Sequence, residues 1–76
     1  MAELTGIMRG TGAKMKADVG DRAVVFRGAF KGEVPFSEID AEARGTLLVL
    51  SFRGHVVEVA AGGRAAQYAA RIRRPG

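Results

Sequence analysis

The chain has no cysteine and a single histidine among its 76 residues. Disulfide bonds and thiolate metal ligands are therefore excluded, and we expect neither a metal site nor a cofactor. No apolar run approaches the ~20 residues that a membrane-spanning helix requires. The first residues also lack the basic and apolar regions of a signal peptide. These absences predict a protein without a membrane span, located in a bacterial-type cytoplasm.

Acidic side chains are absent from the C-terminal segment, residues 64–76. Residues 1–63 carry equal numbers of acidic and basic side chains, so the formal net charge of +4 comes from this segment alone. Its basic residues are Arg64, Arg71, Arg73 and Arg74. A hydrophobic fraction of 47% is typical of a globular chain. Together with the short length, it predicts one domain covering 1–76 with a thin core.

The strongest pattern is a hairpin between Thr46 and Ala60. Alternating residues on each side of Arg53-Gly54 predict two strands joined by a two-residue loop. The expected cross-strand pairs are Phe52 with His55, Leu50 with Val57, and Leu48 with Val59. One face of the hairpin is then apolar, with the histidine at its tip, and forms the floor of the core.

Several short antiparallel strands are predicted within 13–60, because apolar and polar residues alternate there with a period of two. The first carries Lys14 and Lys16 on its water-facing side and ends in a turn at 18–21. Together with Arg9, the two lysines make a basic group near the N-terminus. In the next strand Val24 and Phe26 share one face and Ala23 and Val25 the other. In the later strands Val34, Ala41 and Ala43 are expected to face inward.

Pro35 marks the end of a strand, because proline cannot donate a hydrogen bond to a central ladder. Ser37 is expected to cap the single turn that follows through its hydroxyl. Asp40 and Glu42 then lie on the charged face of a short strand, together with Arg44. Charges at such positions discourage association between sheet edges.

Residues 1–12 are predicted to be a loose lead-in or an edge strand. Gly6, Gly10 and Gly12 interrupt any regular pattern there. The run Gly10-Thr11-Gly12-Ala13-Lys14 has some likeness to a phosphate-binding loop. It lacks the required glycine–lysine spacing, a buried strand before it and a helix after it, so we interpret it as the entry to a strand.

Residues 62–74 predict a C-terminal helix. The spacing of Ala65, Tyr68, Ala69 and Ile72 places them on one helical face, which should pack on the sheet. Arg64, Arg71 and Arg74 fall on the opposite face. A helix this short needs docking to be stable, and Pro75 ends it.

Two motifs stand out in the second half of the chain. They read Gly32-Glu33-Val34-Pro35-Phe36-Ser37-Glu38-Ile39 and Gly63-Arg64-Ala65-Ala66-Gln67-Tyr68-Ala69-Ala70-Arg71-Ile72. With the order of predicted elements, they resemble a group of small bacterial domains of the pleckstrin-homology-like type, in which tryptophan stands at the position of Tyr68. The resemblance covers about residues 22–75. It implies a fold and brings no activity with it.

The predicted fold is α+β: a small, strongly bent antiparallel sheet or partial barrel of about six short strands, with one C-terminal helix. A pleckstrin-homology-like arrangement is the first choice. A simple antiparallel sheet with one helix is the alternative.

No constellation in the sequence supplies a nucleophile with an activating base, so no catalytic residue and no enzyme are expected. We interpret His55 as an exposed or half-packed turn residue. Glu38, Asp40 and Glu42 are the nearest approach to a carboxylate cluster, and we interpret them as surface charges.

The favoured function is a non-enzymatic protein-interaction module, whose partner is another protein or a neighbouring domain. The alternative is weak binding of an anion or nucleic acid through Arg64, Arg71 and Arg74. Dipole complementarity at the helix end is the simpler explanation of these arginines. Nucleic acid is not favoured, because no aromatic residues alternate with them to stack on bases.

Overall fold

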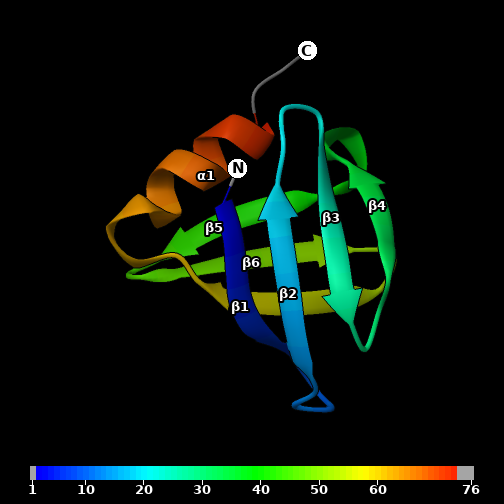
Figure 1. Ribbon diagram of the computed structural model, residues 1–76. Coiled ribbons are helices and arrows are strands. Elements are labelled where there is room, and N and C mark those ends of the chain that lie inside the picture. The colour runs from blue at the N-terminus through cyan, green and yellow to red at the C-terminus, as the bar shows by residue number, and fades with distance from the viewer. Residues whose placement is uncertain (1, 74–76) are drawn as a thin grey trace.

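The computed structural model describes residues 2–73, which form an α+β fold (Figure 1). The strands are β1 (Ala2–Met8), β2 (Lys14–Val19), β3 (Ala23–Gly28), β4 (Gly32–Pro35), β5 (Asp40–Arg44), β6 (Leu47–Phe52) and β7 (His55–Ala60). Two 3-10 turns, η1 (Phe36–Glu38) and η2 (Gly62–Arg64), and the helix α1 (Ala65–Arg73) complete it. The class was predicted correctly, with seven strands in place of about six.

The seven strands make one antiparallel sheet in the order β4-β3-β2-β1-β7-β6-β5. Neighbours along the chain are therefore neighbours in the sheet, except that β1 pairs with β7 and β4 does not pair with β5. Figure 1 shows the sheet curled on itself, with β5, β6 and β7 crossing behind β1, β2 and β3. The result is a half-barrel that is open between β4 and β5.

The prediction for residues 1–12 was wrong. Ala2–Met8 is neither a loose lead-in nor an edge strand but the middle strand of the sheet. Gly6 does not interrupt this strand. A Cβ atom at this position would lie 2.6 Å from the Cα of Val59. Glycine in a strand interior typically marks such a close backbone approach, here where β1 and β7 join the two halves of the sheet.

The hairpin of β6 and β7 has the predicted register. Phe52 pairs with His55, Leu50 with Val57 and Leu48 with Val59. Arg53 and Gly54 form the loop with φ values of 48° and 81°. Two positive φ values are the signature of the type I′ turn, whose twist matches that of the strands.

The core lies inside the curl of the sheet and beneath α1. Its largest fully buried side chains are Met15, Val19, Val24, Phe26, Val34, Leu48, Leu50, Val57 and Val59. The helix packs mainly on β5, with further contacts to β6 and η1. All four residues predicted for its apolar face, Ala65, Tyr68, Ala69 and Ile72, are buried. The sequence predicted this helix over residues 62–74. In the structure Gly62–Arg64 form a 3-10 turn and the α-helix spans Ala65–Arg73, while position 74 lies outside the described residues.

Two local predictions need correction. β2 continues to Val19, so the expected turn at 18–21 begins two residues later. Val19 is buried and pairs with Val24, and this apolar contact extends the strand. The side chain of Ser37 makes no capping hydrogen bond to η1, whose turn is closed by the backbone instead.

Candidate anion-binding groove on the outer sheet face

Lysine and arginine side chains on the outer face of β2 and β3 alternate with core residues. Met15 and Ala17 are buried, so the residues on either side of Met15, Lys14 and Lys16, face outward and are exposed. Phe26 is buried, and Arg27 is therefore exposed on the outer face of β3. The period of two in each strand thus places three cations on one side of the sheet.

The strand register brings these residues together. Lys16 lies opposite Arg27 of β3 on one side and opposite Thr5 of β1 on the other. Lys14 lies opposite Ile7 of β1. Neighbouring strands are about 4.8 Å apart, and residues two apart on a strand are about 7 Å apart. The outer face therefore carries one row of Thr5, Lys16 and Arg27 beside a second row of Lys14 and Ile7.

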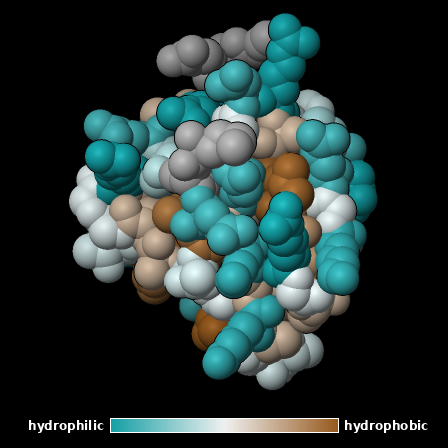
Figure 2. Space-filling model, in the orientation of Figure 1, coloured by the Kyte–Doolittle hydropathy of each residue, from teal (hydrophilic) through white to brown (hydrophobic). Residues whose placement is uncertain are grey.

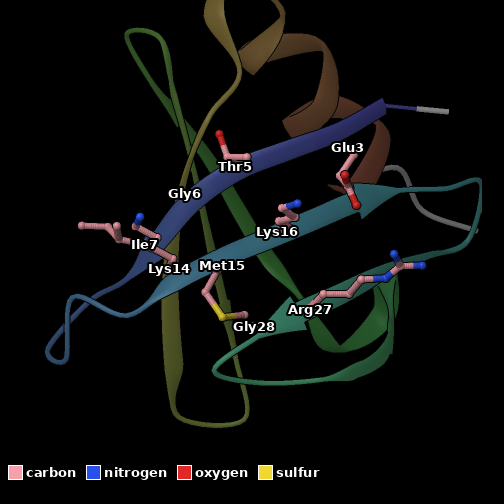
Figure 3. Close-up of a pocket in the computed structure, with 9 residues that line it drawn as sticks. All are labelled: Glu3, Thr5, Gly6, Ile7, Lys14, Met15, Lys16, Arg27 and Gly28. Carbon is pink, nitrogen blue, oxygen red and sulfur yellow. The ribbon is translucent and has the colours of Figure 1, made fainter.

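A shallow groove of about 740 Å³ runs between the two rows (Figure 3). Gly6, Met15 and Gly28 also line it. The side chain of Met15 is buried in the core, so these three residues present mainly backbone to the groove. At Gly28 a Cβ atom would collide with the backbone carbonyl of Lys14. Space-filling shows hydrophilic side chains over much of this side of the molecule, with apolar surface between them (Figure 2).

The cations of the groove are not neutralised within the described residues. The ion pairs there join Arg9 to Glu58, Arg44 to Glu42 and Arg53 to Glu38, so Lys14, Lys16 and Arg27 take part in none of them. Glu3 is the one acidic residue that lines the groove. Three positive charges thus face one negative charge across a small area.

An acidic row borders the groove along the strands. Asp18 lies opposite Glu3 on one side and Val25 on the other, and Val25 lies opposite Glu33. These residues lie about 7 Å beyond the row of Lys16 and Arg27. The positive field is therefore confined to the groove and changes sign at its edge.

The predicted arginine group of the helix is only partly assembled. Arg64 and Arg71 are exposed, and position 74 lies outside the described residues. The guanidinium carbon of Arg71 lies 5.8 Å from the ring centre of Tyr68, a cation–π distance. Arg64 and Arg71 are seven positions apart, which is about 10 Å along a helix axis. The two side chains therefore sit at opposite ends of the helical segment.

The basic group expected from Arg9, Lys14 and Lys16 is different in the structure. Arg9 turns to Glu58, and Arg27 takes its place beside the lysines. Two features of the sequence could have indicated the place of Arg27. It follows Phe26, so it points outward if Phe26 is buried, and a short turn after β2 would place it opposite Lys16.

The remaining candidate residues lie in packing or surface roles. His55 is half-buried, and its ring centre lies 5.8 Å from those of Phe30 and Phe52. Glu38 accepts a hydrogen bond of 2.9 Å from Nε of Arg53, and this bond lowers the pKa of the Glu38 carboxyl. Glu42 pairs with Arg44 at 3.4 Å. No group of three or more histidine or acidic side chains within residues 2–73 is placed to hold a metal ion.

No protein-family model, curated protein or solved structure matches this chain. Within the described part of the chain, α1 falls short of the length and apolar character that crossing a membrane would require.

Proposed function

We propose that this chain is a non-enzymatic protein-interaction module that presents the outer face of its sheet to a partner. The observation that carries the proposal is the combination, on the outward side of the sheet, of cations that form no ion pair and the large hydrophobic residues that are exposed within residues 2–73, Ile7 of β1 and Leu47 of β6. Their side chains are 45% and 39% exposed. Apolar groups rimmed by charge are typical of surfaces that dock other proteins.

Other surfaces of the sheet are less suitable for a partner. The inner face holds the core, and the helix packs on β5. Edge strand β4 has four residues and ends in Pro35, which cannot donate to an added strand. Edge strand β5 places Asp40, Glu42 and Arg44 at exposed positions. Short, charged or proline-containing edges discourage strand addition, so the outer face is the better candidate.

The strand order supports a pleckstrin-homology-like arrangement as part of the same proposal. Two meanders, β1 to β4 and β5 to β7, joined through β1 and β7, make a partly open barrel, and a C-terminal helix packs against it. The bacterial cytoplasm is the location that we propose with it. His55 packs against the rings of Phe30 and Phe52, which supports a structural role for this histidine.

Affinity capture with matched variants tests the proposal. The immobilised protein is exposed to bacterial extract, alongside an Ile7→Ser/Leu47→Ser variant and an Ala66→Ser/Ala70→Ser control on the exposed side of the helix. We expect a protein that is retained by the wild type and the control and lost from the first variant. Thermal melts check that all three remain folded. Equal retention by all three, or no specific retention, would contradict the proposal.

A second candidate function is weak anion or nucleic-acid binding through Arg64, Arg71 and Arg74. It is favoured by the exposure of Arg64 and Arg71, which form no ion pair within the described residues. Binding of duplex or single-stranded nucleic acid should then weaken steeply with salt and fade when the three arginines become alanine. Salt-independent binding, or none on a phosphate column at low salt, would count against this function.

A further inference from the structure

We infer that the groove between β1, β2 and β3 binds a short, extended acidic segment of a partner protein. In this arrangement carboxylates pair with Lys14, Lys16 and Arg27, and an apolar side chain rests on Ile7. The inference depends on the proposed function, because it names the class of partner that the outer face takes.

The charge of the groove points to an acidic ligand. Lys14, Lys16 and Arg27 are unpaired within the described residues, and Glu3 offsets one of the three charges. Arg27 also offers a planar fork that matches a carboxylate in two-point contact. A partner with two or three carboxylates would therefore complement the groove closely.

The dimensions of the groove limit the length of the bound segment. The row from Arg27 to Thr5 crosses three strands, a span of about 10 Å. An extended peptide advances about 3.3 Å per residue, so roughly three residues fill this row. Asp18 and Glu33 lie beside this row, about 7 Å away along the strands, and would repel a polyanion that extended in the strand direction.

The same boundary argues against nucleic acid in this groove. A phosphate chain of several nucleotides that followed the strands would extend past the cations to the acidic row. The described aromatic rings also lie in the interior, at buried or half-buried positions. Bases would therefore find no exposed ring to stack on, and such stacking is the main sequence-tolerant contribution to single-strand binding.

A small inorganic anion should bind only weakly in this groove. β2, which carries Lys14 and Lys16, pairs along its length with β1 and β3, so its backbone amides are engaged in the sheet ladder. Only its exposed side chains remain to contact the anion. A peptide adds apolar contact with Ile7, whose side chain lies beside Lys14 at the groove wall. Peptide binding should thus exceed that of phosphate alone.

Fluorescence anisotropy with a labelled acidic peptide tests the inference. The probe is a peptide of about ten residues that alternates glutamate with leucine, a length that covers the groove with room at both ends. A version with glutamine in place of glutamate is the peptide control. The groove variant is Lys16→Gln/Arg27→Gln. The matched control is Arg22→Gln/Arg73→Gln, which removes the same two charges from exposed positions outside the groove.

We expect the wild type to bind the glutamate peptide saturably. The affinity of the groove variant should be about tenfold lower, and that of the matched control should lie within about twofold of the wild type. Ile7→Ser should lower the affinity for the peptide by about threefold. Equal loss in both charge variants would overturn the inference, because net charge alone would then explain binding. Tighter, groove-dependent binding of an RNA oligonucleotide would also overturn it, as would tighter, groove-dependent binding of inorganic phosphate or groove-dependent self-association.

The peptide experiment and the capture experiment test different claims, so each can be contradicted without the other. If the captured partner depends on Ile7 and Leu47 but the acidic peptide does not bind, the outer face is an interaction surface and only the acidic ligand is wrong. If the peptide binds through Lys16 and Arg27 but nothing depends on Leu47, the groove acts without the wider face.

Discussion

Substitution of Gly6 by alanine should strongly destabilise the fold. Gly6 lies in the interior of β1, where it pairs with Met15 on one side and Val59 on the other. A Cβ atom here would lie 2.6 Å from the Cα and 2.7 Å from Cγ1 of Val59, and closer still to the carbonyl oxygen of Glu58. Most of these atoms belong to the backbone of β7, so no side-chain rotation relieves the clash. β1 and β7 must move apart.

Overpacking typically costs about 1–3 kcal/mol, and we expect the upper end here, because the β1–β7 pairing joins the two halves of the sheet. A domain of this size has roughly 4–11 kcal/mol of stability in total. A loss of about 3 kcal/mol should lower Tm by roughly 12–24 °C. Urea denaturation followed by circular dichroism measures the free energy, and a thermal melt measures Tm.

Gly63→Ala is the matched control. No atom lies within 4 Å of the Cβ that this change would add. It should leave stability unchanged or raise it by about 0.4–1 kcal/mol, because alanine restricts the unfolded chain more than glycine does. If the free energy of unfolding of Gly6→Ala were within about 0.5 kcal/mol of the wild-type value, the close approach of β1 and β7 would be refuted.

Further predictions concern the core and the ion pair. Leu50→Ala empties a fully buried site and should cost ~2–5 kcal/mol in chemical denaturation. Leu47→Ala, on the same strand but 39% exposed, should cost less than ~1 kcal/mol, and similar losses from both would contradict the assigned faces. Arg53→Gln should raise the pKa of Glu38 towards its ordinary value of 4.5, as measured by NMR titration of the carboxyl group. The ion pair holds the folded-state pKa below the unfolded one, so its stabilisation is present above the unfolded pKa and lost as pH falls through the folded pKa. Arg53→Gln should flatten that acid dependence, and an unchanged pKa of Glu38 would contradict the contact.

The hairpin and the helix could be predicted from sequence because their signals are local. Arg53-Gly54 sets the register of β6 and β7, so one turn determines every cross-strand pair. Ala65 and Ile72 mark a helical face whose spacing does not depend on any other part of the chain. In both cases the pattern and the packing agree.

The place of β1 could not be predicted in this way. Gly6 normally counts against a strand, and its role becomes clear only when β7 lies against it. The groove was missed for a more local reason, because it depends on the registers of two hairpins and the turn after β2 was predicted two residues too early. Lys14 and Lys16 were recognised as outward-facing, but Arg27 joins them only through the register of β2 with β3, and Ile7 only through that of β1 with β2.

The pairing of β1 with β7 also has a consequence for folding, because it joins residues near the two ends of the chain. Arg9 and Glu58, which meet at this junction, are 49 positions apart. Closing a loop of about 50 residues costs roughly 2 kcal/mol more than closing one of about 5, so each meander should form before the two are joined. At about 5–20 residues per second on the ribosome, β1 is made several seconds before β7. During that interval one edge of the first meander has no strand of its own chain to cover it, and it is open to pairing with other chains.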